Sequence, residues 1–147
     1  MLDIDKDTIS HIFLTHNDMD HVGALSLFPK AEIYLGEESK IKDTYRYKFL
    51  KDNEIIEVGT IKVQVINAPG HRVGHVNYLI SDKFLFTGDA IILREGKVQP
   101  FYKLISSNFD NQLKSIRKIA KLKNIEGLFT AHGGYTTEFD EAIKEWK

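Results

Sequence analysis

Residues 15–23 read Thr-His-Asn-Asp-Met-Asp-His-Val-Gly, and this stretch decides how the rest of the chain is interpreted. It overlaps an apolar run at residues 11–15, whose β-branched and aromatic residues predict a short buried strand. The stretch then places four side chains that can bind a metal within six residues, namely His16, Asp18, Asp20 and His21. In an extended chain the first three of these point the same way, and the fourth joins them where a helix begins. Imidazoles and carboxylates together suit a divalent first-row metal.

Helix capping is the alternative explanation of this stretch, because aspartate often accepts hydrogen bonds from the first N–H groups of a helix. A single aspartate would be explained in this way. Two histidines and two aspartates within six positions are not, so the cluster favours a metal site.

Length and composition describe one globular domain over residues 1–147. The formal net charge of −1 gives no electrostatic reason to expect nucleic acid as a partner. The sequence contains no apolar run long enough to cross a membrane and no signal-peptide core, so no membrane association is predicted. Cysteine is absent, which excludes disulfides and thiolate ligands and fits a cytoplasmic protein. Any metal must therefore be held by histidine, aspartate and glutamate.

The remaining pattern is that of a single α/β unit, with residues 1–10 as a lead-in turn. Strands are predicted at residues 11–15, 32–35, 54–58, 60–66, 75–81, 83–87 and 125–130. Helices are predicted at residues 22–28, 36–43, 108–122 and 137–147. Residues 44–51 fit either a helix or a loop, and residues 90–105 are predicted to be rich in loops.

Three further candidate ligands each follow a predicted strand, as His16 does: they are His71, Asp89 and His132. If those strands run in compatible directions, all of these side chains lie at one edge of the sheet system. Each motif also fits an ordinary turn when it is considered alone. His75 is interpreted as a supporting residue rather than a ligand, and His11 as a packed strand residue.

Taken in order, the motifs resemble those of the metallo-β-lactamase-fold superfamily. The motifs are His16-x-Asp18-x-Asp20-His21, Pro69-Gly70-His71-x-x-Gly74-His75, Phe86-Thr87-Gly88-Asp89 and Ala131-His132-Gly133. The resemblance implies an αββα sandwich with a dinuclear metal site. It implies one ion bound by His16, Asp18 and His71, a second bound by Asp20, His21 and His132, and Asp89 bridging the two.

Two departures from the usual pattern of the superfamily lead to further expectations. Asp18 stands where a second histidine is usual, and a carboxylate is a harder ligand. Zinc is expected, with the preference shifted somewhat toward iron or manganese.

The second departure is the short segment before the first motif, because only fifteen residues precede His16. We therefore expect an incomplete first sheet, an exposed sheet edge or apolar face, and self-association into a homo-oligomer; a monodisperse monomer in sedimentation at micromolar concentration would contradict this.

The chemistry implied by the resemblance is metal-assisted hydrolysis of a small-molecule ester, thioester, lactone, amide or phosphodiester. Asp20 is expected to orient the attacking hydroxide and relay its proton, while His75, Thr15 and Thr130 orient the ligands. The substrate-binding residues are not identified by the sequence. Residues near the ligands, namely Arg72, Arg94, Lys97, Phe101, Tyr102, Lys103 and Tyr135, fit either contacts to an anionic substrate or ordinary loop residues. A di-iron redox protein of the flavodiiron type and a truncated metal-binding domain without turnover are the alternatives.

Overall fold

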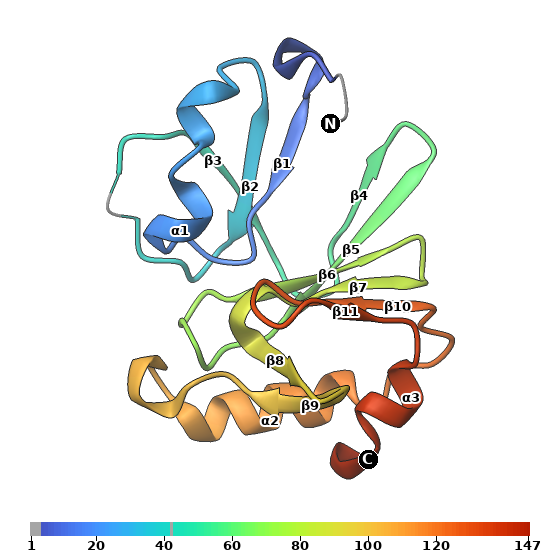
Figure 1. The fold of residues 1–147 in the computed structure, drawn as a ribbon. Helices are drawn as coiled ribbons and strands as arrows, with labels where there is room; N and C mark the ends of the chain where they lie inside the picture. The colour runs from blue at the N-terminus through green and yellow to red at the C-terminus, as the bar shows by residue number, and fades with distance from the viewer. Residues whose placement is uncertain (1–3, 42) are drawn as a thin grey trace.

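The computed structural model describes residues 4–41 and 43–147, and its strands form two main sheets (Figure 1). The smaller sheet has three parallel strands in the order β1-β2-β3. They comprise β1 (His11–Phe13), β2 (Glu32–Gly36) and β3 (Tyr47–Leu50). β1 therefore lies at an edge of this sheet.

The larger sheet has six strands in the order β11-β10-β7-β6-β5-β4. They comprise β4 (Ile55–Val58), β5 (Ile61–Asn67), β6 (Val76–Ile80), β7 (Phe84–Phe86), β10 (Gly127–Phe129) and β11 (Tyr135–Thr136). β6 pairs antiparallel with both β5 and β7, and β7 pairs parallel with β10. Consequently β5, β7 and β10 all point in the same direction. The candidate ligands that follow these strands can therefore lie at one edge of the sheet. A separate hairpin is formed by β8 (Ile91–Arg94) and β9 (Lys97–Pro100).

Helices cover the outer face of each main sheet (Figure 1). They comprise α1 (Met19–Val22), α2 (Phe109–Ile119) and α3 (Phe139–Ala142). Short 3-10 helices lie at η1 (Lys6–Thr8), η2 (Leu25–Leu27), η3 (Gly88–Ala90), η4 (Lys103–Ile105) and η5 (Lys144–Trp146). The start of α2 is capped by Asn108, whose side-chain oxygen accepts a hydrogen bond of 3.0 Å from the N–H of Asn111.

Three apolar clusters match the three interfaces of an αββα arrangement. One packs α1 and η2 against the small sheet through residues such as Val22 and Leu35. The second lies between the sheets around Tyr34 and Tyr78. The third packs α2, α3 and the β8–β9 hairpin against the large sheet, with Leu128 fully buried. The fold is therefore the sandwich that the sequence motifs predict.

Part of the inner face of the large sheet carries exposed aromatic side chains. Phe86 stacks on Phe129 with ring centroids 4.6 Å apart, and Phe129 stacks on Tyr135 at 5.7 Å. Phe86 is 37% exposed and Tyr135 is 69% exposed. Among the described residues, β1 pairs only with β2, and its Phe13 lines a cavity together with Phe86 and Phe129. An apolar face and an open strand edge are therefore present, and self-association through them stays a prediction.

Several predicted elements differ in the structure. The helix predicted over residues 36–43 is wrong, apart from residue 42, which lies outside the described residues. The Ser39 hydroxyl donates to the carbonyl of Gly74 and the Asn17 amide donates to the carbonyl of Lys40, so tertiary contacts hold this stretch as a turn. The helices predicted at residues 22–28 and 137–147 are each divided into a four-residue α-helix and a 3-10 turn, and α1 begins earlier than expected.

Two stretches predicted to lack strands contain them. Residues 44–51 include β3, which is defined by pairing with β2 and has no clear alternation of its own. Residues 90–105 include the β8–β9 hairpin, whose turn at Glu95 and Gly96 has positive φ at both positions. The lead-in predicted at residues 1–10 contains η1, and residues 1–3 lie outside the described part of the chain. No helix in the described part is both long and apolar enough to cross a bilayer.

Candidate metal centre

The predicted ligands lie on loops that follow the carboxyl ends of strands from both sheets. His71, Asp89 and His132 follow β5, β7 and β10, which run in the same direction. The stretch that begins at His16 follows β1 of the small sheet. The two sheets are joined here because the N–H of Val76 donates to the carbonyl of Thr15 at 2.9 Å. The topology therefore brings these loops to one place.

A first group of donor atoms is formed by His16, Asp18 and His71. Asp18 Oδ2 lies 3.7 Å from His16 Nε2 and 3.3 Å from His71 Nε2. Both imidazoles are buried, with side-chain exposures of 0% and 1%. Asp18 immediately precedes α1 and has an extended backbone, which directs its carboxylate toward the two rings.

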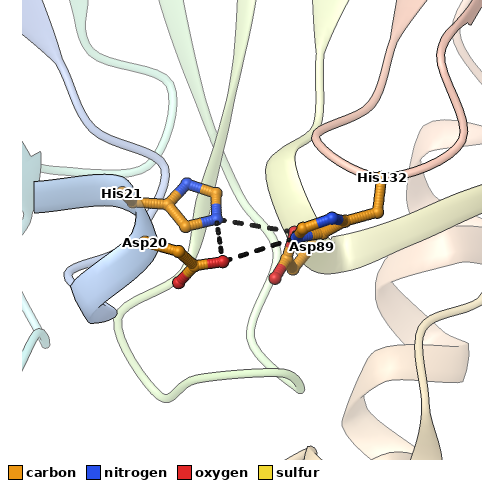
Figure 2. Close-up of side chains that lie close together, drawn as sticks. All are labelled: Asp20, His21, Asp89 and His132. Carbon is orange, nitrogen blue, oxygen red and sulfur yellow. Dashed lines mark ion pairs between the residues drawn. The ribbon is translucent and has the colours of Figure 1, made fainter.

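A second group is formed by Asp20, His21, Asp89 and His132 (Figure 2). Asp20 Oδ2 lies 3.7 Å from His21 Nε2 and 3.5 Å from His132 Nε2. The side chain of Asp20 is 58% exposed and that of His132 is 46% exposed, so this group is the more accessible to solvent. The extended-chain argument placed Asp20 with His16 and Asp18. The structure instead begins α1 at Met19, and Asp20 therefore joins His21 in the second group.

Asp89 lies between the two groups and faces both. Its Oδ2 is 3.7 Å from His16 Nε2 and 3.6 Å from His71 Nε2. Its Oδ1 is 3.6 Å from His21 Nε2 and 3.5 Å from His132 Nε2. The carboxylate is only 4% exposed. One buried carboxylate thus has an oxygen directed at each group.

These separations fit metal coordination. Donor atoms about 2.0–2.2 Å from a tetrahedral ion are themselves about 3.3–3.6 Å apart. The donor separations in both groups fall between 3.3 and 3.7 Å. Within the described part of the chain, the buried atoms His16 Nε2 and Asp89 Oδ1 also have no hydrogen-bond partner, although buried polar atoms normally have one. The residues therefore fit divalent ions in both groups.

The two imidazoles of the first group are held in the neutral form, which has a lone pair to donate. Burial lowers the pKa of His16 far below its ordinary value, with further lowering from the neighbouring His75, His21 and His71. Burial also lowers the pKa of His71. Both rings are consequently neutral near pH 7, which is the form that binds a metal.

The carboxylate of Asp89 remains ionised although its burial opposes the charge. Burial would raise the pKa of Asp89, but the neighbouring imidazole of His21, 3.6 Å away, together with those of His132 and His71, brings the pKa below its ordinary value. The neighbouring Asp89 carboxylate correspondingly raises the pKa of His21. The ionised carboxylate of Asp89 beside the neutral rings of His16 and His71 forms a donor set that favours a cation.

The residues predicted to support the ligands have different contacts. Thr15 Oγ1 lies 3.1 Å from His16 Nδ1, so it can fix the orientation of that ring. Thr130 Oγ1 donates instead to the carbonyl of His132 at 3.1 Å and to that of Gly134 at 2.9 Å, which fixes the loop rather than the ring. Within the described residues, neither donor group includes His75. Its ring stacks on His16 at 4.9 Å, and its Nε2 donates to the carbonyl of Thr87 at 2.9 Å.

The buried ring of His75 predicts a pH-dependent stability of the metal-free protein. Burial lowers the pKa of His75 from 6.5 to about 4. As the pH falls, the His75 ring therefore becomes protonated near pH 6.5 in the unfolded chain but only near pH 4 in the folded chain. The stability associated with His75 is complete above pH 6.5 and is lost as the pH falls toward 4, by about 3 kcal/mol.

Urea unfolding of chelator-treated protein at pH 7 and pH 4.5 measures this loss. His75→Gln keeps a donor toward Thr87 and has no titrating ring, so its stability should fall less over the same interval. An equal fall in the wild type and in the variant would show that His75 does not cause the pH dependence.

Two residues suggested as substrate contacts have other roles in the structure. The guanidinium of Arg72 is hydrogen-bonded to Asp18, a contact that sequence reasoning missed because the two residues are separated by 54 positions. Phe101 is buried, and its ring centroid lies 5.0 Å from that of His71 and 5.5 Å from that of His132. Phe101 therefore forms an apolar wall that contacts one imidazole of each group.

The family model described as the metallo-beta-lactamase superfamily matches residues 1–125. The chain belongs to this superfamily. Members of the superfamily bind divalent metals, which agrees with the two donor groups described above.

Individual relatives support the same assignment. A hydroxyacylglutathione hydrolase of Dictyostelium discoideum is 31% identical over 139 residues, which cover 80% of this chain and 51% of the relative. The chain thus spans about half the length of that relative. The structure of an archaeal superfamily protein from Sulfolobus tokodaii has a TM-score of 0.77 at 21% identity, covering 95% of this chain and 66% of that one. The structure of TTHA1623, solved in a di-iron-bound form, has a TM-score of 0.69 at 24% identity, covering 90% of this chain and 74% of the other.

Proposed function

We propose that this chain is a metal-dependent hydrolase that binds two divalent ions, preferably zinc, and cleaves a small-molecule thioester. The position of Asp89 carries the dinuclear part of the proposal, because each of its oxygens lies within 3.7 Å of two imidazole nitrogens. The relative named hydroxyacylglutathione hydrolase supports the thioester part. Fold alone would not specify a substrate.

Each donor group has a separate task in this proposal. His16, Asp18 and His71 would hold one ion, and Asp20, His21 and His132 would hold the other. Asp89 would be shared between them. When bound, a pair of divalent ions supplies a nucleophile at neutral pH and draws electron density from the carbonyl oxygen of the substrate. The greater exposure of Asp20 and His132 places the second group on the side from which a substrate can approach.

Asp20 is the residue proposed to move the proton. Its Oδ2 faces His21 and His132, and Oδ1 of this 58% exposed side chain would accept the proton of the attacking water and pass it to the departing sulfur. The Phe101 ring excludes water from one side of the imidazoles, which strengthens electrostatic interactions there. These roles require no side chain beyond those already gathered at the loops.

Metal analysis and hydrolysis assays test the proposal together. Freshly purified protein should contain about two transition-metal ions per chain and should release thiol from a hydroxyacylglutathione thioester faster than it cleaves a nitrophenyl ester or bis-nitrophenyl phosphate. His132→Gln should lose both properties. His11→Gln is the matched control, because His11 lies in β1 and belongs to neither donor group. Protein without bound transition metal would refute the proposal, and metal without turnover would favour a metal-binding domain.

A di-iron redox protein is the second candidate, supported by Asp18 as a hard ligand and by the di-iron-bound form of TTHA1623. Iron as the main metal, combined with oxygen consumption in the presence of a reductant, would favour this candidate. Thioester hydrolysis by the zinc-loaded protein would favour the first.

A further inference from the structure

The guanidinium of Arg72 makes four hydrogen bonds around the first donor group. Its Nε donates to Asp18 Oδ1 at 2.7 Å and its Nη2 donates to Asp18 Oδ2 at 2.5 Å. Its Nη1 donates to the carbonyl of His71 at 2.8 Å and to that of Ile105 at 2.7 Å. An arginine side chain has five N–H donors, so almost all of its capacity is used inside the protein. Arg72 therefore has little capacity left to bind a substrate.

The bidentate hydrogen bonding of Arg72 to Asp18 determines which oxygen of Asp18 can serve as a ligand. Asp18 Oδ2 faces both His16 and His71, whereas Oδ1 accepts from Arg72 Nε. A carboxylate oxygen has more than one lone pair, so Oδ2 can accept from Nη2 and still bind a cation. Oδ2 is therefore the oxygen placed to bind an ion with the two imidazoles, while Arg72 Nε holds Oδ1 turned toward the guanidinium. The arginine thus selects a single-oxygen mode of binding for Asp18.

The same contact also cancels charge. The guanidinium of Arg72 donates to both oxygens of Asp18, at 2.7 and 2.5 Å, and its positive charge there favours the ionised carboxylate. Arginine stays protonated, so the pair is neutral as a whole. An ionised aspartate with its arginine therefore contributes one ligand atom and no net charge, as a neutral histidine would. Lysine could supply the charge but not the planar fork.

We propose that Arg72 is a positioning residue that fixes Asp18 as a one-oxygen, charge-compensated ligand of the first metal ion. The inference rests on the metal centre of the proposed function and not on turnover. The contacts of Nη1 join the loop after β5 to Ile105 of η4, which follows β9. A purely structural arginine would act through these carbonyl contacts, and the two roles can be separated because only the first depends on Asp18.

Zinc affinity, measured by competition with a chromophoric chelator, tests the inference without an activity readout. Arg72→Gln is expected to lower the zinc affinity of one of the two sites by about 10- to 100-fold, which is the usual effect of losing a residue that orients a ligand. Arg72→Lys should recover only part of this loss. Arg117→Gln, on the exposed side of α2, is the matched control and should bind zinc as the wild type does.

The double variant Asp18→His/Arg72→Gln distinguishes positioning from a structural role. If Arg72 acts through Asp18, replacing the aspartate with histidine removes the need for the arginine, and the double variant should bind zinc more tightly than Arg72→Gln alone. Equal weakness of both variants would assign Arg72 to the carbonyl contacts and overturn the inference. Wild-type affinity in Arg72→Gln would also overturn it and would leave the proposed function standing. Wild-type protein that binds no zinc would overturn both.

Discussion

Replacing Asp89 with alanine is expected to remove most of the metal from both donor groups and to reduce hydrolysis by at least about 100-fold. Asp89 is the one carboxylate among the described residues whose two oxygens approach four imidazole nitrogens, two in each group. Without it, each group loses an anionic ligand, and the three carboxylates that would offset two cations are reduced to two. Metal content per chain, measured by mass spectrometry after gel filtration, gives the result directly.

His75→Ala is the comparison variant for Asp89→Ala. Its ring is as deeply buried, but within the described residues it belongs to neither donor group: it packs against the rings of His16 and His71 and donates to the carbonyl of Thr87. We therefore expect this variant to retain most of its metal while it loses stability. Equal metal content in the two variants would refute the ranking and with it the central place of Asp89. Asp89→Asn refines the test, because it preserves shape and removes only the charge.

The predicted architecture succeeded where local pattern and final burial coincide. β5 alternates buried Val63 and Val65 with partly exposed Lys62 and Gln64, and the sequence shows this alternation. α2 buries Ile116 and Ile119 on one side, as its apolar stripe predicts. The positions of the candidate ligands after strands were visible for the same reason. The direction of those strands depends on how they pair in the sheet, and the sequence alone did not predict it.

The failures occurred where contacts distant in sequence determine the structure. β3 has an irregular burial pattern, and it is a strand because Tyr47 to Leu50 pair with β2. The stretch after β2 has the composition of a surface helix but is held by hydrogen bonds to Gly74 and Asn17. The Arg72–Asp18 pair joins two motifs that were interpreted separately. The β8–β9 hairpin is different, because Gly96 lies three residues after the apolar run 91–93 and is a local turn signal.

Gly88→Ala is expected to destabilise the protein by about 3 kcal/mol and to disturb the metal centre at the same time. Gly88 precedes Asp89 and has a φ of +50°, which costs an alanine about 1 kcal/mol or more. An added Cβ would also lie 2.2 Å from Thr15 Oγ1 and 2.8 Å from Thr15 Cβ, and such overpacking typically costs about 1–3 kcal/mol. Thr15 cannot retreat freely, because its carbonyl accepts from Val76 and its hydroxyl lies beside His16.

Gly59→Ala separates the two parts of this cost. Gly59 has a φ of +62°, close to that of Gly88, but an added Cβ there meets nothing within 4 Å. Its loss of unfolding free energy therefore measures the backbone contribution alone, and zinc binding should stay unchanged. The excess loss in Gly88→Ala, together with weaker zinc binding, then measures how tightly the loop after β7 is packed against the loop after β1. If the two variants lose the same stability and both keep their zinc, the close contact between Gly88 and Thr15 does not hold Asp89 and His16 in register, and the positioning of the shared carboxylate must come from elsewhere in the loop.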